Sequence, residues 1–84
     1  MAKPTALSGR GNSPEKAFGQ VLRSVRESRD LSQEELAARA GYHRTYIGQL
    51  ERGEKSPSLR TIFNLSFTLK VNPSVLIRRV ERSI

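Results

Sequence analysis

Three residues with hydrogen-bonding side chains lie close together in the segment RTYIGQ, residues 44–49. The Arg44 guanidinium can donate two parallel hydrogen bonds to guanine, and Thr45 offers a hydroxyl and a methyl group. Gln49 follows Thr45 by four residues, so the two side chains share a face if the segment is helical. Ile47 and Leu50 would lie on the opposite face. The chemistry of this segment is recognition through hydrogen bonds.

The chain lacks the residues that disulfides, metal binding and catalysis need. The 84-residue chain contains no cysteine, so it has no disulfide and no thiolate metal ligand. Its single histidine, His43, has no partner ligand nearby and is not expected to bind a metal. We find no nucleophile–base pair and no phosphate-binding loop. We therefore expect no enzyme, no cofactor, no metal and no small-molecule ligand.

The charge of the chain favours a polyanionic partner. Fifteen Lys and Arg residues oppose eight Asp and Glu residues, which gives a net charge of +7 and a pI of about 10.9. Lysine and arginine bind nucleic acid by neutralising phosphates and releasing counterions. A basic solvated surface without a specific partner is the alternative.

Length and hydropathy indicate one small domain away from the membrane. A chain this short buries a limited core, so self-association is expected. No apolar run approaches the roughly 18 residues of a membrane span, and the N-terminus has no apolar stretch of signal-peptide length. We expect a cytoplasmic protein, associated with the nucleoid if it binds DNA.

Helix-start signals recur along the chain and predict an all-α fold. Ser13 precedes an apolar stripe at helical spacing, and Ser32 with Glu35 matches a capping box. A third helix is expected from His43 or Arg44 up to Gly53. Ser58 and Pro73 mark the starts of two further helices. No segment alternates apolar and polar residues as a strand would, so we predict five helices.

The helical pattern breaks at Gly41 and restarts within three residues. Gly41 can take a positive φ without steric cost, as a sharp turn requires. Ala37, four residues earlier, is small enough for the next helix to approach, and Ile47, six residues later, can lock the crossing. This spacing is typical of a helix-turn-helix, whose second helix can enter the DNA major groove.

The segment LSQEELAARAGYHRTYIGQLERGEKSPSLRTI resembles the lambda-repressor-like helix-turn-helix family, also called the Cro/C1-type or XRE family. The resemblance covers about residues 18–77. The positions that match the family motif are Leu31, Gln33, Leu36, Ala37, Gly41, Ile47, Leu50, Glu51, Gly53, Pro57 and Leu59. The resemblance implies a compact five-helix domain, residues 15–84, with the helix-turn-helix at its second and third helices.

The resemblance also implies roles for individual residues. Arg44, Thr45 and Gln49 would read base edges in double-stranded DNA. Arg26 and Glu51 would pair, joining the first helix to the end of the third. The residues expected to contact the DNA backbone are Gln33, His43, Tyr46, Arg52, Lys55 and Ser56. Tyr46 has the alternative role of shielding the core edge, and His43 that of capping the third helix.

Two departures from the family pattern concern the fourth helix. Lys70 stands where glycine is frequent, so we expect this helix to end differently. Phe67 stands where a charged residue is frequent and pairs with Phe63 at i, i+4. We expect both rings either at a dimer face or under the last helix. The expected dimer face comprises Phe67, Val75, Leu76, Ile77 and Val80; the alternative is that the last helix only completes the monomer core.

Together these features predict a sequence-specific transcriptional regulator, of repressor or controller type, that binds a two-fold operator as a homodimer. The alternative is an antitoxin or adaptor that uses the same fold mainly to bind another protein. Arg44 and Gln49 favour DNA, whereas exposed aromatic residues favour a protein partner. Residues 1–14 read as a flexible basic tail, either an arm that touches DNA or a disordered terminus.

Overall fold

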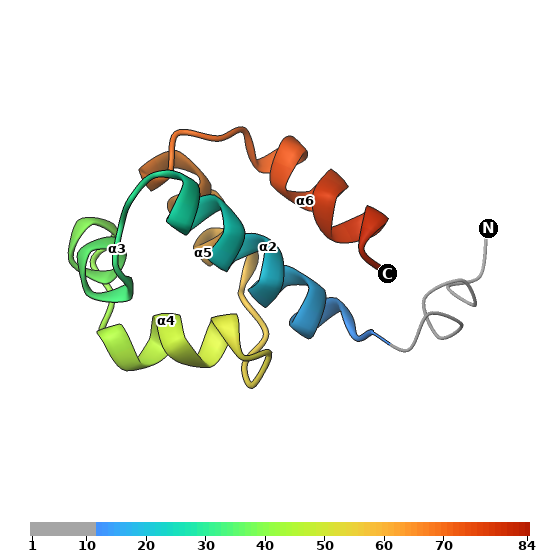
Figure 1. Ribbon diagram of the computed structural model, residues 1–84, viewed down its shortest axis with the longest axis horizontal. Coiled ribbons are helices and arrows are strands. Elements are labelled where there is room, and N and C mark those ends of the chain that lie inside the picture. Colours follow the sequence, from blue (N-terminus) through green and yellow to red (C-terminus); the bar gives the residue numbers. More distant parts are fainter. Residues whose placement is uncertain (1–11) are drawn as a thin grey trace.

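The computed structural model describes residues 12–84 and contains five helices and no strand in that range. This confirms the predicted all-α class. Labels follow Figure 1, in which the helices are α2 (Pro14–Ser28), α3 (Gln33–Ala40), α4 (Arg44–Glu51), α5 (Leu59–Thr68) and α6 (Pro73–Arg82). The expected tail, residues 1–14, lies outside the described residues except for its last three, of which Pro14 already belongs to α2.

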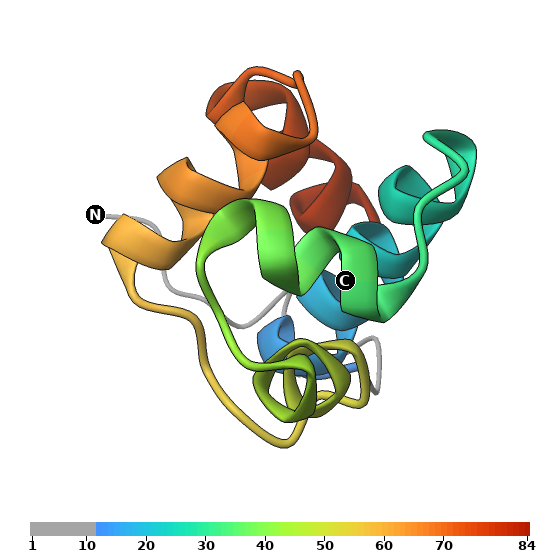
Figure 2. The ribbon, with the colours of Figure 1, turned by 90° about the vertical axis from the view of Figure 1, so that its left-hand side faces the viewer.

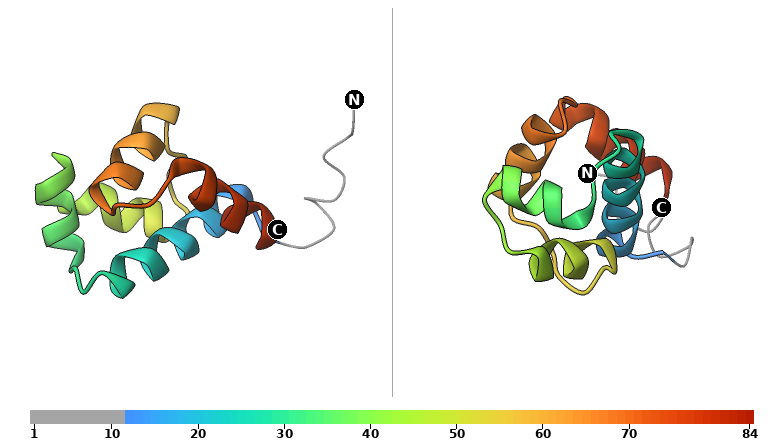
Figure 3. Two further views of the ribbon diagram at one scale, coloured as in Figure 1. Left: turned by 90° about the horizontal axis from the view of Figure 1, so that it is seen from above. Right: turned by 60° about the vertical axis from the view of Figure 1, so that its left-hand side comes forward.

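Helix α2 lies at the centre of the domain. It packs against α4 on one side and α6 on the other, so these two helices lie on opposite sides of α2 (Figure 1). α3 contacts α4 and α5, and α5 contacts α6. In both views of Figure 3 the chain continues from α4 through a loop into α5 (orange) and then α6 (red). Within residues 12–84, no helix is long and apolar enough to cross a membrane.

Side-chain caps start four of the five described helices. The hydroxyl of Ser13 accepts a hydrogen bond from the Lys16 amide at 3.0 Å. Ser32 and Glu35 form the complete capping box, with bonds of 2.8 and 3.0 Å between side chain and backbone. Ser58 caps α5 with a single bond, in which its hydroxyl accepts from the Thr61 amide at 3.0 Å. Each cap satisfies amide groups that the first helical turn leaves without a partner.

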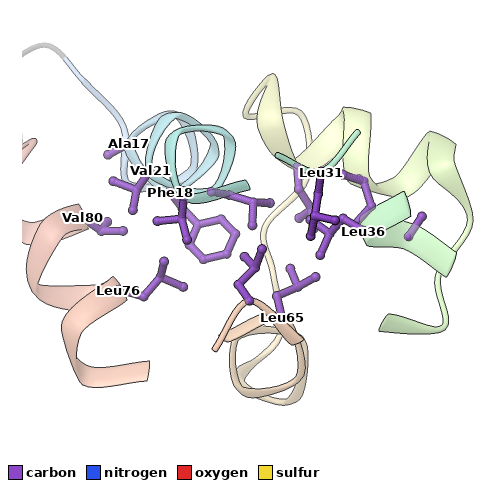
Figure 4. Close-up of a cluster of buried hydrophobic side chains, with 14 of the residues drawn as sticks. Ala17, Phe18, Val21, Leu31, Leu36, Leu65, Leu76 and Val80 are labelled. Carbon is purple, nitrogen blue, oxygen red and sulfur yellow. The ribbon is translucent and has the colours of Figure 1, made fainter. Parts of the chain in front are cut away.

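The helices meet around one apolar core that all five of them line (Figure 4). Two residues expected at a dimer face belong to this core: Leu76 is 0% exposed and Val80 is 8% exposed. Figure 4 shows them directed toward Phe18 and Val21 of α2. That expectation was therefore wrong for Leu76 and Val80. They are four residues apart, so they share one stripe of α6 and bury it against the core.

The end of α5 corrects a second expectation. Lys70 has φ +59°, so it adopts the left-handed conformation despite its side chain. The amide of Lys70 donates to the Phe67 carbonyl and that of Val71 to the Ser66 carbonyl, as in a Schellman cap. Arg29 also donates to the Leu69 carbonyl at 2.8 Å. These bonds hold the helix end that glycine usually forms, so α5 ends in the family manner.

Candidate nucleic-acid interface

Helices α3 and α4 form the predicted helix-turn-helix. Gly41 has φ +82° and accommodates the turn between them. Ala37 and Ile47 are 2% and 0% exposed, so both lie in the core where the two helices meet. Figure 2 views α4 nearly along its axis with α3 running across it, which shows the steep crossing. The structural roles predicted for these three residues are confirmed.

The outer face of α4 carries the three residues expected to read bases. Arg44 and Thr45 are exposed in its first turn, and Gln49 is half-buried one turn later. The opposite face is anchored, because Ile47 and Leu50 are both 0% exposed. α4 therefore presents one polar face to solvent, and its contact with bases stays a prediction.

His43 has the capping role that was one of its two interpretations. Its Nδ1 accepts a hydrogen bond from the Thr45 amide at 3.1 Å, as an N-cap does. The ring therefore helps to fix the first turn of α4, the turn that carries Arg44. A contact between His43 and DNA phosphate stays a prediction.

The remaining residues expected at the DNA backbone lie at the ends of helices or in a loop. Gln33 is the first residue of α3, where amide groups and the helix dipole favour an anion. Arg52 follows α4 and pairs with Glu54 at 2.7 Å on the surface. Lys55 and Ser56 are exposed in the loop between α4 and α5.

A buried ion pair joins α2 to the end of α4, as predicted. Arg26 Nε lies 2.6 Å from Glu51 Oε2, and their side chains are 9% and 4% exposed. Arg26 also donates to the Leu31 carbonyl at 2.7 Å. The hydrogen bond to the Glu51 carboxylate raises the pKa of Arg26 above its usual range. Arg26 therefore stays charged, and its hydrogen bonds to Glu51 fix the C-terminal end of α4.

Gln33 also contacts this ion pair, and the sequence analysis missed that contact. Its Nε2 donates to Glu51 Oε1 at 2.9 Å. A carboxylate only accepts hydrogen bonds, so the amide nitrogen must face Glu51. One of the two Nε2 protons is thereby used, and the other has no partner among residues 12–84.

Tyr46 lies in a hydroxyl cluster whose other members the sequence analysis did not single out. Its hydroxyl lies 3.3 Å from Oγ1 of Thr61, which also contacts Tyr42. Tyr46 is half-buried and packs against the core, so it does shield the core edge. Its expected contact with the DNA backbone stays a prediction. The sequence signal for this cluster was two tyrosines four residues apart, one before α4 and one in its first turn.

Gly19 in α2 is another residue whose role the sequence did not reveal. A Cβ atom at this position would lie 2.4 Å from the Leu50 carbonyl oxygen and 2.5 Å from that of Glu51. Contacts this short between non-bonded heavy atoms do not occur, so only glycine permits the observed approach of α2 to α4. Gly19 thus sets the distance between the central helix and the end of the helix expected to read DNA.

An apolar stripe on α5 is exposed to solvent. Leu59, Phe63 and Phe67 follow each other every four residues and are 71%, 43% and 65% exposed. The two phenyl rings make an edge-to-face contact, with centroids 5.9 Å apart. With Tyr42 they line a shallow groove. The interpretation that the Phe rings pack under the last helix was wrong, because both rings are exposed.

The fold and this site define a helix-turn-helix DNA-binding protein. The chain belongs to the helix-turn-helix family HTH_3, whose family model matches residues 22–76. Members of this family are DNA-binding transcriptional regulators and not enzymes. The resemblance to the XRE family and the double-stranded DNA partner are thereby confirmed.

Two relatives and one crystal structure illustrate what this chain is similar to. The chain is 44% identical over 61 residues to the control protein C.BamHI of Bacillus amyloliquefaciens. This match covers 71% of this chain and 75% of C.BamHI. It is 43% identical over 62 residues to the control protein C.SmaI of Serratia marcescens, covering 74% of each. The crystal structure of the restriction-modification controller protein C.AhdI from Aeromonas hydrophila superposes with a TM-score of 0.71 at 43% identity, covering 73% of this chain and 92% of that one.

Proposed function

We propose that this protein is a transcriptional regulator of the restriction-modification controller type, which binds a two-fold DNA operator as a homodimer. The observation that carries the proposal is the exposed polar face of α4 in a domain whose relatives include restriction-modification controller proteins. Such a regulator acts in the cytoplasm, where bacterial DNA is.

In this proposal α4 lies in the major groove. Arg44 donates to guanine O6 and N7, while Thr45 and Gln49 contact the neighbouring bases. Gln33 at the start of α3 and Lys55 in the loop after α4 contact backbone phosphates on either side of the major groove. The contacts with bases give sequence specificity, and the contacts with phosphates set the register of the domain on the duplex.

The homodimer follows from how little one helix can read. A single recognition helix contacts only a few base pairs, whereas a two-fold dimer places two such helices about 34 Å apart, one turn of DNA. We place the dimer contact on the α5 stripe of Leu59, Phe63 and Phe67, which is solvent-exposed and apolar. Val75 and Ile77 of α6, which are 37% and 44% exposed, form its margin at most.

The same α5 stripe favours a second candidate function. An exposed apolar surface is also what an antitoxin or adaptor uses to bind a different protein. The two functions differ in their dependence on DNA: a regulator loses function when α4 is altered, whereas an adaptor loses it only when the stripe is altered.

Selection of bound duplexes from a random pool, read by sequencing, tests the proposal. We expect a site with two-fold symmetry and half-sites one helical turn apart. With about six phosphates neutralised per dimer, log affinity should fall with log salt concentration at a slope of about −5. A pool that yields no enriched sequence, or affinity that does not change with salt, contradicts the proposed function.

A further inference from the structure

Four hydroxyl groups form a cluster between α4 and the N-terminal end of α5. At its centre is Thr61, which is 6% exposed. Its Oγ1 lies 3.3 Å from the Tyr42 hydroxyl, 3.3 Å from the Tyr46 hydroxyl and 3.0 Å from the Ser58 hydroxyl. The rings of Tyr42 and Tyr46 also pack together, with centroids 5.1 Å apart. The cluster therefore ties α4 to the turn before it and to the helix after it.

The geometry of two of these bonds, with a count of donors and acceptors, fixes the direction of the third. A threonine hydroxyl has one proton to donate and two lone pairs that accept. Tyr42 and Ser58 both donate to Thr61 Oγ1, which uses its two lone pairs. The single proton of Thr61 must then go to the third neighbour, Tyr46. The Tyr46 hydroxyl accepts inside the cluster, so its own proton is free for an acceptor outside it.

A free proton matters at this position because phosphate oxygens only accept hydrogen bonds. Tyr46 is half-buried on α4, two residues after Arg44. If its hydroxyl donated inward to Thr61, it would present only lone pairs to a phosphate and repel it. With the proton outward, it can make a charge-assisted bond, which is about twice as strong as a neutral one.

We propose that Tyr42 is a positioning residue for DNA binding: by donating to Thr61, it keeps the Tyr46 hydroxyl proton available for an operator phosphate. This inference rests on the proposed function, because it requires that α4 lies against DNA. Tyr42 itself need not touch DNA. Without its hydroxyl, a lone pair of Thr61 becomes vacant, and Tyr46 can donate inward instead.

The test compares Tyr42→Phe, Tyr46→Phe and the double variant for binding to the selected operator at one salt concentration. A hydrogen bond to a charged group supports an expected loss of about tenfold for Tyr46→Phe, and a smaller loss of about threefold for Tyr42→Phe. The double variant should bind no more weakly than Tyr46→Phe. Losses that multiply, or full affinity of Tyr42→Phe, would overturn the proposal.

Two threonine variants separate positioning from a general effect on the fold. Thr61→Val removes the acceptor, so adding Tyr42→Phe to it should cause no further loss of affinity. Thr68 lies on the same helix and donates to the Asn64 carbonyl, outside the cluster. In a Thr68→Val background Tyr42→Phe should keep its threefold effect. An equal loss in both backgrounds would mean that Tyr42 acts only on stability, which overturns the proposal; thermal unfolding of each variant reports that stability directly.

Operator binding by the wild-type protein distinguishes failure of the proposed function from failure of the Tyr42 role. If the wild type binds no duplex, the proposed function fails. If it binds its operator and Tyr42→Phe binds equally well, only the role of Tyr42 fails.

Discussion

At the scale of single residues, the site divides into side chains that point outward and side chains that hold them in place. Arg44 and Thr45 are exposed, whereas Arg26 and the side chain of Glu51 are almost completely buried. The exposed residues have no part in the core, so their substitution tests recognition. The buried pair has no access to DNA bases, so its substitution tests stability.

The outward residues predict a difference between specificity and general affinity. Arg44→Ala should cost about 1–3 kcal/mol on the selected operator and relax the preference at one base pair. Lys55→Ala should weaken binding to all sequences alike and reduce the salt slope by about 1. Binding measured on the operator and on single-base variants distinguishes the two.

Arg78→Ala is the control for this comparison, since Arg78 is exposed on α6, across α2 from α4. Its affinity should stay near that of the wild type. If Arg44→Ala weakened every sequence equally, α4 would not be the helix that reads the bases.

The buried pair predicts a large coupling energy. Arg26→Met and Glu51→Gln should each lower the free energy of unfolding by about 3–5 kcal/mol, because each leaves the other partner buried and unpaired. The double variant should lose less than the sum of the two. Chemical denaturation of the four proteins measures the coupling, and a value near zero would show that the pair contributes nothing specific.

At the scale of elements, the position of α4 depends on how closely α2 approaches it. Gly19→Ala would place a methyl group 2.4 Å from the Leu50 carbonyl, so α4 must move away. We expect a loss of about 2 kcal/mol or more in the free energy of unfolding, as for other overpacked sites. Operator affinity should fall as well, because the displaced helix carries Gln49.

Gly48→Ala provides the matched control, a second glycine inside a helix. The nearest atoms to a Cβ there belong to the Arg52 guanidinium, with Nη1 at 3.0 Å, which is the far end of a flexible side chain. Alanine is about 1 kcal/mol better than glycine in a helix interior, so this variant should be as stable as the wild type or more so. Equal stabilities of the two variants would contradict the argument from close approach.

At the scale of the whole molecule, assembly depends on which apolar surface the monomer leaves uncovered. Phe63 and Phe67 of α5 are exposed, and burying a phenyl ring contributes about 1.5–3 kcal/mol. Sedimentation at micromolar concentration should show a dimer. Phe63→Ser with Phe67→Ser should convert it to a monomer and weaken operator binding.

Val75→Ser with Ile77→Ser is the corresponding change on α6. It should leave the dimer largely intact if the contact lies on α5. A dimer that survives the changes on α5 and dissociates with those on α6 would place the interface on α6 instead.

The sequence by itself determined the local structure and the class of protein. Caps at Ser13, Ser32 and Ser58 and the left-handed Gly41 depend on neighbours within a few residues, so their spacing was sufficient. The outward face of α4 also followed, because helical periodicity separates Arg44 and its neighbours from Ile47.

Several contacts between helix faces were visible only once the helices were packed together. Leu76 and Val75 are adjacent and both apolar, yet only the packing of α6 on α2 and α5 buries the first and leaves the second accessible. The close approach of Gly19 to Leu50 and the contacts of Thr61 with Tyr42 and Tyr46 join residues fifteen or more positions apart. No local pattern encodes such contacts, because they arise from the crossing of helices and from the direction of hydrogen bonds between them.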